Sequence, residues 1–280
     1  MPVSARQIDP SYRDTAELAQ RAPMETPPSG AVRVAGRPAS AAQEIALKIN
    51  GSVDWSPWCN SDFTTCTYTW PVHNITQGTD YPTIQAAVDA ANPGDAIHVD
   101  AGTYAEHVAV NKAVSLVGAA GATIDGGGTG TVVTLSASGA TVEGFTIRHS
   151  GATAGDAGVL VTSVSGCTVK SNTVTNNANG IALVMASGNF VTSNAVSANA
   201  FYGIALAGAL NNTIDLNAVI GNGLDAIALD NASAVGGDTT TGSTGNLIKG
   251  NTISSSRDGI FLGENCDNNQ VTGGNALTNI

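Results

Sequence analysis

Charged and aromatic residues are scarce in this sequence. Asp, Glu, Lys and Arg together make up 12% of the 280 residues, and Phe, Trp and Tyr make up 5%. A conventional α/β enzyme would carry more large apolar side chains in its core and more Lys and Glu on its helices. The chain is instead built from Ala, Val, Thr, Ser, Asn and Gly, including 33 glycines, which favours strands and tight turns.

Positive charge is rarer still beyond residue 50. Residues 51–280 contain five Lys and Arg against seventeen Asp and Glu, which gives a formal charge of −12. Such a surface repels a phosphate backbone, so we expect no nucleic acid among the partners. Cations, neutral glycans and basic surfaces remain compatible with this charge.

Long apolar runs are also missing from the sequence. No window reaches the roughly 18 consecutive apolar residues of a membrane-spanning helix, so no membrane span is predicted. The N-terminal residues MPVSARQIDPSYRD lack the apolar core of a secretion signal, which taken literally indicates the cytoplasm. However, the repeat described below stops at Ile280 before it is complete, so we expect a fragment without its native ends.

The chain divides into three parts. Residues 1–44 show no periodic apolar face and are expected to form a disordered leader. Residues 45–81 hold six of the thirteen aromatics, which either pack over the end of a core, the interpretation we favour, or form a sugar platform. From residue 82 onward we expect one repetitive domain, opened by a helix that starts at Thr83 and ends before Asn92-Pro93-Gly94. Strands are expected at 96–100 and 113–118.

The strongest signal in the sequence is an internal repeat. Four glycines and one alanine precede short apolar strands at intervals of 22, 23, 23 and 33 residues: Gly158, Gly180, Gly203, Ala226 and Gly259. A unit of this length with short strands, small-residue turns and no helix predicts one coil of a parallel β-helix. Leucine-rich repeats have a similar period, but their leucine frame and helical segment are absent. Successive coils would rise by about 4.8 Å, so that residues at the same phase form columns.

One such column consists of asparagines, namely Asn172, Asn194, Asn217, Asn251 and Asn275. Asn tolerates the left-handed backbone that a sharp corner requires, and stacked Asn side chains can hydrogen-bond along the column. We therefore interpret this column as structural.

The segment at 81–108, TyrProThrIleGlnAlaAlaValAspAlaAlaAsnProGlyAspAlaIleHisValAspAlaGlyThrTyrAlaGluHisVal, resembles the opening of pectin-lyase-like right-handed β-helix proteins. The later repeats resemble those of NosD-like and carbohydrate-binding-and-sugar-hydrolysis domains. The resemblance covers about 75–280 and implies an all-β, right-handed parallel β-helix solenoid with a short N-terminal capping helix. It does not define a function, because the superfamily includes lyases, hydrolases, esterases, epimerases and non-catalytic surface proteins.

The catalytic motifs of the superfamily are mostly absent from the sequence. The resemblance to pectate lyases, pectin methylesterases and mannuronan epimerases does not extend to their active-site motifs. Asp225-Ala-Ile-Ala-Leu resembles the Asp-Asp segment of polygalacturonases, but Leu224 replaces the first aspartate. This replacement puts hydrolase chemistry in doubt.

The phase of the repeat predicts one group of polar side chains that lie close together. Asp225 and Asp258 both precede the first strand of a coil and should lie about 5 Å apart, so either one carboxyl is protonated or a cation lies between them. Tyr202 lies one coil below as a possible sugar platform, and the same two coils contain Asp230, Arg257 and Glu264. Three interpretations remain open for the two aspartates: a solvated acidic edge, which we favour, a calcium site, or a catalytic carboxylate pair.

Four further features have simpler interpretations. Arg148 and His149 at a strand end are interpreted as turn surface rather than as a binding pair, and the insertion at 234–245 as a surface loop. Cys59 and Cys66 flank an Asn-Ser-Asp turn and could close a hairpin disulfide in an oxidising compartment. Cys167 and Cys266 fall four coils, about 19 Å, apart and should be separate thiols. No Cys/His set has the spacing of a zinc site.

The sequence therefore predicts a secreted or cell-surface bacterial β-helix that binds polysaccharide and has no recognisable catalytic set. We expect it to be a monomer or part of a longer surface protein. The first alternative is a polysaccharide lyase or glycoside hydrolase that uses Asp225 and Asp258, with calcium as the only cofactor considered. The second alternative is a structural adhesin or spacer.

Overall fold

The computed structural model describes residues 70–230 and 241–280, together with the backbone of four short strands before them. These are β1 (Leu47–Ile49), β2 (Val53–Trp55), β3 (Trp58–Cys59) and β4 (Cys66–Thr67). The chain forms two units, residues 1–70 and residues 71–280. The predicted leader at 1–44 and most of the insertion at 234–245 lie outside the described residues.

The backbone of the first unit bears on the predicted disulfide. Strands β3 and β4 pair in antiparallel fashion, and Cys59 lies directly opposite Cys66. Their side chains lie outside the described residues, so the disulfide stays a prediction.

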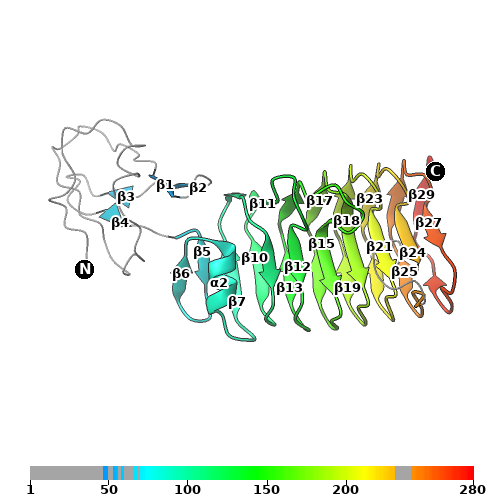
Figure 1. The fold of residues 1–280 in the computed structure, drawn as a ribbon, viewed down its shortest axis with the longest axis horizontal. Coiled ribbons are helices and arrows are strands. Elements are labelled where there is room, and N and C mark those ends of the chain that lie inside the picture. The colour runs from blue at the N-terminus through cyan, green and yellow to red at the C-terminus, as the bar shows by residue number, and fades with distance from the viewer. Residues whose placement is uncertain (1–46, 50–52, 56–57, 60–65, 68–69, 231–240) are drawn as a thin grey trace. The chain divides into compact units, whose positions relative to one another are not determined.

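The second unit is a parallel β-helix of about eight turns, as the repeat predicts. Figure 1 shows its strands stacked one after another along a single axis. Every complete coil contributes one strand to each of three sheets, and the strands pair in parallel with the equivalent strands one coil away. We call the turns from the ten- to the eight-stranded sheet the first corner, those from the eight- to the seven-stranded sheet the second corner, and those back to the ten-stranded sheet the third corner.

The strands of the three sheets have the following bounds. The ten-stranded sheet contains β5 (Val72–Asn74), β6 (Thr79–Tyr81), β7 (Ala96–Val99), β10 (Ser115–Gly118), β13 (Thr141–Glu143), β16 (Thr168–Lys170), β19 (Phe190–Thr192), β22 (Thr213–Asp215), β25 (Leu247–Lys249) and β28 (Gln270–Val271). The eight-stranded sheet contains β8 (Gly102–Tyr104), β11 (Ala122–Asp125), β14 (Thr146–Arg148), β17 (Thr173–Thr175), β20 (Ala195–Ser197), β23 (Ala218–Ile220), β26 (Thr252–Ser254) and β29 (Ala276–Thr278). The seven-stranded sheet contains β9 (Val108–Val110), β12 (Val133–Leu135), β15 (Ala157–Thr162), β18 (Asn179–Val184), β21 (Ile204–Ala207), β24 (Ile227–Asp230) and β27 (Ile260–Leu262).

The start of the solenoid is closed by the predicted helix, α2 (Ile84–Ala90). Thr83 is its N-cap and accepts a hydrogen bond from the Ala86 N–H, while Glu106 accepts from the N–H groups of Ile84 and Gln85. The helix buries Ile84 and Val88 against the first coil. Figure 1 shows the helix beside β5 and β7. Strands β5 and β6 form an antiparallel hairpin that continues the ten-stranded sheet past β7, so the sheet already begins before residue 82.

The core of the solenoid is a stack of aliphatic side chains. Along each strand, inward residues alternate with outward ones, and the inward column of the seven-stranded sheet includes Val159, Ile181, Ile204 and Ile227. The glycines that mark the repeat form a neighbouring column, because each lies one residue before a member of this one. A methyl group at Gly203 would lie 2.6 Å from the carbonyl oxygen of Ala226 and 2.8 Å from Asn222 Nδ2. The second corner therefore leaves no room for a side chain at Gly203, whereas Ala226, at the same phase of the repeat, carries a buried methyl group.

The predicted asparagine column is confirmed as a hydrogen-bonded ladder at the first corner. The side-chain Nδ2 of each member donates to the Oδ1 of the next, at 3.0–3.1 Å. The prediction that these asparagines adopt the left-handed backbone is wrong, because the positive φ falls one residue earlier. Ser171, Ser193 and Leu216 have φ of 55°, 57° and 56°.

The sequence analysis missed two further ladders. The third corner carries Asn189, Asn212, Asn246 and Asn269, and the second corner carries Asn177, Asn199 and Asn222. Every corner of the solenoid is thus lined by buried amides that satisfy backbone groups of the neighbouring coils.

The two cysteines of the solenoid are separate thiols, as predicted. Cys167 is fully buried at the phase of the third-corner ladder, and its backbone N–H donates to Asn189 Oδ1 at 2.8 Å. Burial raises the pKa of this thiol, so it remains protonated at neutral pH.

Candidate functional site

The second corner is the most varied edge of the solenoid. Its turns span 126–132 and 149–156 in two early coils and 221–226 and 255–259 in two late coils. Polar side chains cluster at both ends of this row of turns. Arg148 ends the strand before an early turn, and Ser254 ends the strand before a late one. Neighbouring coils are hydrogen-bonded in register, so these two residues are four coils, or about 19 Å, apart.

The late cluster contains the predicted pair Asp225 and Asp258 with Arg257 between them. The guanidinium of Arg257 makes a bidentate contact with Asp225, with Nε donating to Oδ1 at 3.0 Å and Nη2 donating to Oδ2 at 2.9 Å. Nε also donates to Asp258 Oδ2 at 3.3 Å. The side chain of Asp225 is 1% exposed, whereas those of Arg257 and Asp258 are 54% and 55% exposed. The sequence left open whether one carboxyl is protonated or a cation lies between the two, and in the structure the guanidinium of Arg257 contacts both.

The pKa of Asp225 is raised above its ordinary value. Burial is the largest cause and the neighbouring Asp258 carboxyl adds to it, while Arg257 acts in the opposite direction and lowers the pKa. The buried carboxylate therefore depends on Arg257 for its charged form.

Replacing Arg257 with methionine is expected to make the stability of the solenoid depend on pH. The substitution removes the group that lowers the pKa of Asp225, so that ionising the buried carboxyl opposes folding more strongly. A carboxyl whose folded-state pKa is raised contributes to the stability of the folded protein at low pH. This contribution is lost as the pH rises through the folded-state pKa. The loss of melting temperature relative to wild type should thus be roughly twice as large at pH 7 as at pH 4.

The control for this prediction is the double variant R257M/D225N, in which no carboxyl remains to be ionised at this position. Its melting temperature, followed by circular dichroism, should differ from wild type by a similar amount at both pH values. An equal loss at pH 4 and pH 7 for R257M itself would contradict the proposed dependence of Asp225 on Arg257.

The other predicted residues lie around this pair at different distances. Tyr202 is partly buried one coil before Asp225, packs with Val184 against the buried Ala205 and Ala207, and has its pKa raised by burial and then by Asp225. Asp230 ends β24 on the outer face, where Gly263 of the next coil lies against its carboxylate. Glu264 is exposed in the turn after β27. The structure thus brings Asp225, Asp230 and Arg257 within electrostatic reach of Tyr202, whereas Glu264 lies in the turn at the other end of β27.

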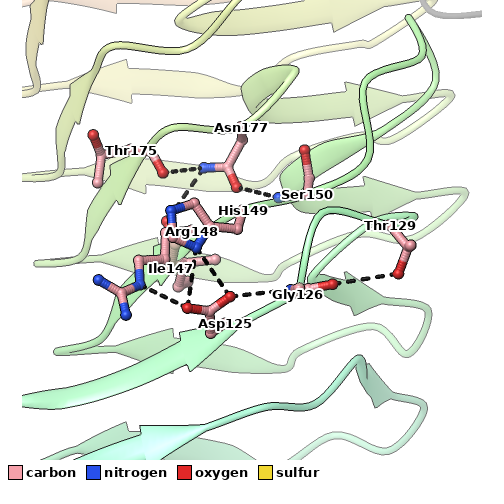
Figure 2. A network of polar contacts seen from close by, with 10 residues as sticks. Asp125, Gly126, Thr129, Ile147, Arg148, His149, Ser150, Thr175 and Asn177 are labelled. Atoms are coloured by element: carbon pink, nitrogen blue, oxygen red, sulfur yellow. Dashed lines mark hydrogen bonds and ion pairs between the residues drawn. The ribbon is translucent and has the colours of Figure 1, made fainter.

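The early cluster consists of Asp125, Arg148 and His149, of which Arg148 and His149 were predicted to be turn surface. Figure 2 shows Arg148 and His149 both directed toward Asp125, which lies one coil earlier. Arg148 Nε donates to Asp125 Oδ2 at 2.9 Å, and His149 Nδ1 lies 3.1 Å from both carboxylate oxygens. Burial raises the pKa of Asp125, but hydrogen bonds from Gly127 N–H, His149 and Arg148 outweigh it and hold the pKa below its ordinary value. Asp125 is therefore ionised at neutral pH.

A cavity of about 290 Å³ opens directly beside the early cluster. Its lining consists of uncharged residues from three successive coils of the second corner: Ser150, Gly151, Ala152, Asn176, Asn177, Ala178, Ala198 and Ala200. Ala200 precedes Tyr202 by two residues, so the cavity extends from the early cluster toward the late one. Neither Asp125 nor this cavity was predicted from the sequence, although Asp125 lies at the same position of the repeat as Arg148.

The described residues offer no convergent set of metal ligands. Across 70–230 and 241–280, no three or more His, Cys, Asp or Glu side chains are arranged to hold a metal ion. His73 contacts Asp80 at 2.7 Å and Asp100 at 3.2 Å through its two ring nitrogens, and its ring stacks on His98 with centroids 6.5 Å apart. Both ring nitrogens of His107 are likewise engaged, by Thr131 O and Thr129 Oγ1.

Comparison with known proteins identifies similar families and folds. The family model described as "Periplasmic copper-binding protein (NosD)" matches residues 88–279. No curated protein matches the chain. Among the described residues, no helix is long and apolar enough to cross a membrane.

Three solved structures illustrate the likeness of the fold. A double mutant of the periplasmic alginate epimerase AlgG is 15% identical with a TM-score of 0.48, and the match covers 65% of this chain and 46% of that one. The pectin methylesterase from Yersinia enterocolitica is 11% identical with a TM-score of 0.43, over 71% and 94%. The alginate lyase from Paenibacillus sp. is 13% identical with a TM-score of 0.39, over 63% and 65%. The chain thus matches about half the length of the epimerase.

Proposed function

Since the chain belongs to the NosD family of β-helix proteins, we propose that it is a secreted or cell-surface protein that binds polysaccharide along its second corner. The family is described as periplasmic, which agrees with a place outside the cytoplasm. We further propose that the protein acts as a monomer or as part of a longer surface protein.

The observation that carries this proposal is the cavity between the two polar clusters. Its lining includes Ala178, Ala198 and Ala200, whose small side chains let a sugar ring approach the backbone, and Asn176 adds a polar group. The coil rise of about 4.8 Å is comparable to the length of one sugar unit in an extended chain, so equivalent contacts can repeat from coil to coil. Tyr202 and the exposed carboxylate of Asp258 extend the same row toward the C-terminal end.

Tyr202 provides the direct test of this proposal. Aromatic rings bind the apolar faces of sugars, so Tyr202→Leu should weaken binding about tenfold, or ~1.4 kcal/mol, while Tyr202→Phe should retain it. Binding would be measured by isothermal titration calorimetry with glycans first selected on a glycan array. Phe190→Leu is the matched control, because Phe190 is an exposed aromatic of the ten-stranded sheet, outside the second corner.

Two results would contradict polysaccharide binding at this site. Equal loss of affinity in Tyr202→Leu and Phe190→Leu would exclude the second corner as the binding surface. Failure of the folded protein to bind any glycan on the array would favour the alternative of a structural adhesin or spacer.

A second candidate function is polysaccharide cleavage with Asp225 and Asp258 as the catalytic pair. The observation that favours it is the buried Asp225 carboxyl, whose pKa is raised by burial and by the exposed Asp258 carboxyl beside it, although the Arg257 guanidinium lowers it. A raised carboxyl pKa is one property of a general acid. Release of reducing or unsaturated sugar that disappears in Asp258→Asn, without loss of binding, would support this activity. No product from the glycans that bind would count against it.

Metal binding is a separate question from glycan binding. Calcium at Asp225 and Asp258 stays a prediction that calcium-dependent melting would test, with Asp225→Asn as the control. The guanidinium of Arg257 already supplies the positive charge at that position. The family description names copper, but the described residues do not fit a copper site, because no convergent set of His, Cys or carboxylate ligands is present among them. The proposed function therefore assigns no role to either metal.

A further inference from the structure

We propose that the glycan bound at the second corner is uncharged. This inference rests on the proposed function and specifies the chemical class of its ligand. Two independent features of the solenoid support this assignment. All of its cationic side chains are already engaged within the chain, and the lining of the cavity carries no charge.

The first feature concerns the cations away from the second corner. Residues 71–280 contain only five Lys and Arg. Lys112 donates to the carbonyl oxygens of Asp89 and Ala91 at the C-terminal end of α2. On the ten-stranded sheet, Lys170 pairs with Glu143 at 2.9 Å and Lys249 with Asp215 at 3.6 Å. These three groups stabilise the solenoid and are held outside the cavity.

The remaining two cations lie at the ends of the proposed site. Arg148 is held by Asp125, whose side chain is only 16% exposed, and Arg257 is held by the buried Asp225. Proteins recognise carboxylate and sulfate groups through bidentate contacts with free guanidinium groups. Both guanidiniums of the second corner already make charge-assisted contacts to carboxylates of the chain, Arg148 through Nε and Arg257 through Nε and Nη2, so the charge that would attract an anionic sugar is neutralised within the chain.

The second feature is the charge of the site as a whole. The eight residues that line the cavity are uncharged. The Ser150 hydroxyl and the Asn177 amide are hydrogen-bonded within the chain, and the rest of the lining is the Asn176 amide and small apolar groups. Residues 71–280 contain fifteen Asp and Glu, a formal charge of −10 with the five cations included. A polyuronate carries one carboxylate on every sugar and would be repelled along its whole length. An uncharged chain avoids this repulsion, and a cationic sugar would find no carboxylate in the lining.

The test compares one glycan backbone in three charge states. The neutral glycan with the highest affinity is converted to a carboxymethyl derivative and to an aminoethyl derivative, and all three are titrated at about 50 and about 500 mM salt. We expect the neutral glycan to bind with an affinity that salt changes by less than about twofold, and the carboxymethyl derivative to bind at least about tenfold more weakly at low salt.

A pair of variants isolates the role of the engaged arginine. Asp125→Asn releases Arg148 beside the cavity and should strengthen binding of the carboxymethyl derivative at least about fivefold. Asp215→Asn releases Lys249 on the ten-stranded sheet in the same way, and it should leave that affinity within about twofold of wild type.

Each outcome decides the inference. Wild-type binding of the carboxymethyl or aminoethyl derivative tighter than the neutral glycan, with strong weakening by salt, would overturn the assignment and leave the proposed function intact. Equal effects of Asp125→Asn and Asp215→Asn would also overturn it. Absence of binding to every glycan would overturn the proposed function and this inference together.

Discussion

Replacing Gly180 with alanine is expected to lower the free energy of unfolding by about 3 kcal/mol or more. The added methyl group would meet the carbonyl oxygen of Gly203, Cγ1 of Val196 at 2.5 Å and Nδ2 of Asn199 at 2.9 Å. All three atoms belong to the next coil, so the collision can be relieved only by separating coils. Chemical denaturation of the purified variant would measure the loss.

Two substitutions serve as controls for Gly180→Ala. Gly273→Ala adds the same methyl group at a position with no atom within 4 Å, and should change stability by less than about 0.5 kcal/mol. Ala226→Gly removes a buried methyl group at the same phase of the repeat, and should lower stability by about 1 kcal/mol. A stability of Gly180→Ala equal to that of Gly273→Ala would contradict the explanation given for the glycine column.

Replacing Asn194 with alanine should destabilise the solenoid by about 3 kcal/mol or more, because it interrupts the first-corner ladder at its middle. The amide Nδ2 of Asn194 donates to Asn217 Oδ1 at 3.0 Å, to Val169 O at 2.9 Å and to Thr192 O at 3.1 Å. Its Oδ1 accepts from both the backbone and the side chain of Asn172. Alanine would leave several of these groups buried without a partner, in a place where the side chain is 1% exposed.

The matched control for the ladder is Asn111→Ala. Asn111 is exposed in the turn between β9 and β10, and its replacement should change the free energy of unfolding by less than about 0.5 kcal/mol. Urea denaturation of both variants, followed by circular dichroism, gives the comparison. If Asn194→Ala were as stable as Asn111→Ala, the ladder would contribute nothing measurable to the stability of the fold.

The repeat made most of the fold predictable. Gly158, Gly180 and Gly203 recur with the period of one coil, and a period of this length with short strands leaves a parallel β-helix as the arrangement that pairs every strand. The same argument places Asn172 and Asn194 in one column from the sequence alone. The ladders that contain Asn177 and Asn189 recur at the same period but were not predicted, because the period does not distinguish a buried corner amide from one exposed in a turn.

The candidate site was predictable only in part. The phase of the repeat correctly placed Asp225 in the coil next to Asp258. It left open whether one carboxyl is protonated or a cation lies between them, and it did not identify Arg257 as that cation. Asp125 was missed because its partners, Arg148 and His149, lie one coil later and reach it only when the two coils are stacked. An outward residue at the same phase as Arg148, 23 positions earlier, was the available signal.

The sequence by itself determined the architecture of this protein, because strand register in a solenoid is set by the repeat length and each coil can only pair with its neighbours. It also determined the recurrence of glycine at the second corner and of asparagine at the first corner, since the same corners recur from coil to coil. The tertiary structure alone decided how Asp225, Arg257 and Asp125 are paired and where the cavity opens. These features depend on the reach of individual side chains and on turns of unequal length, which the period of the repeat does not encode.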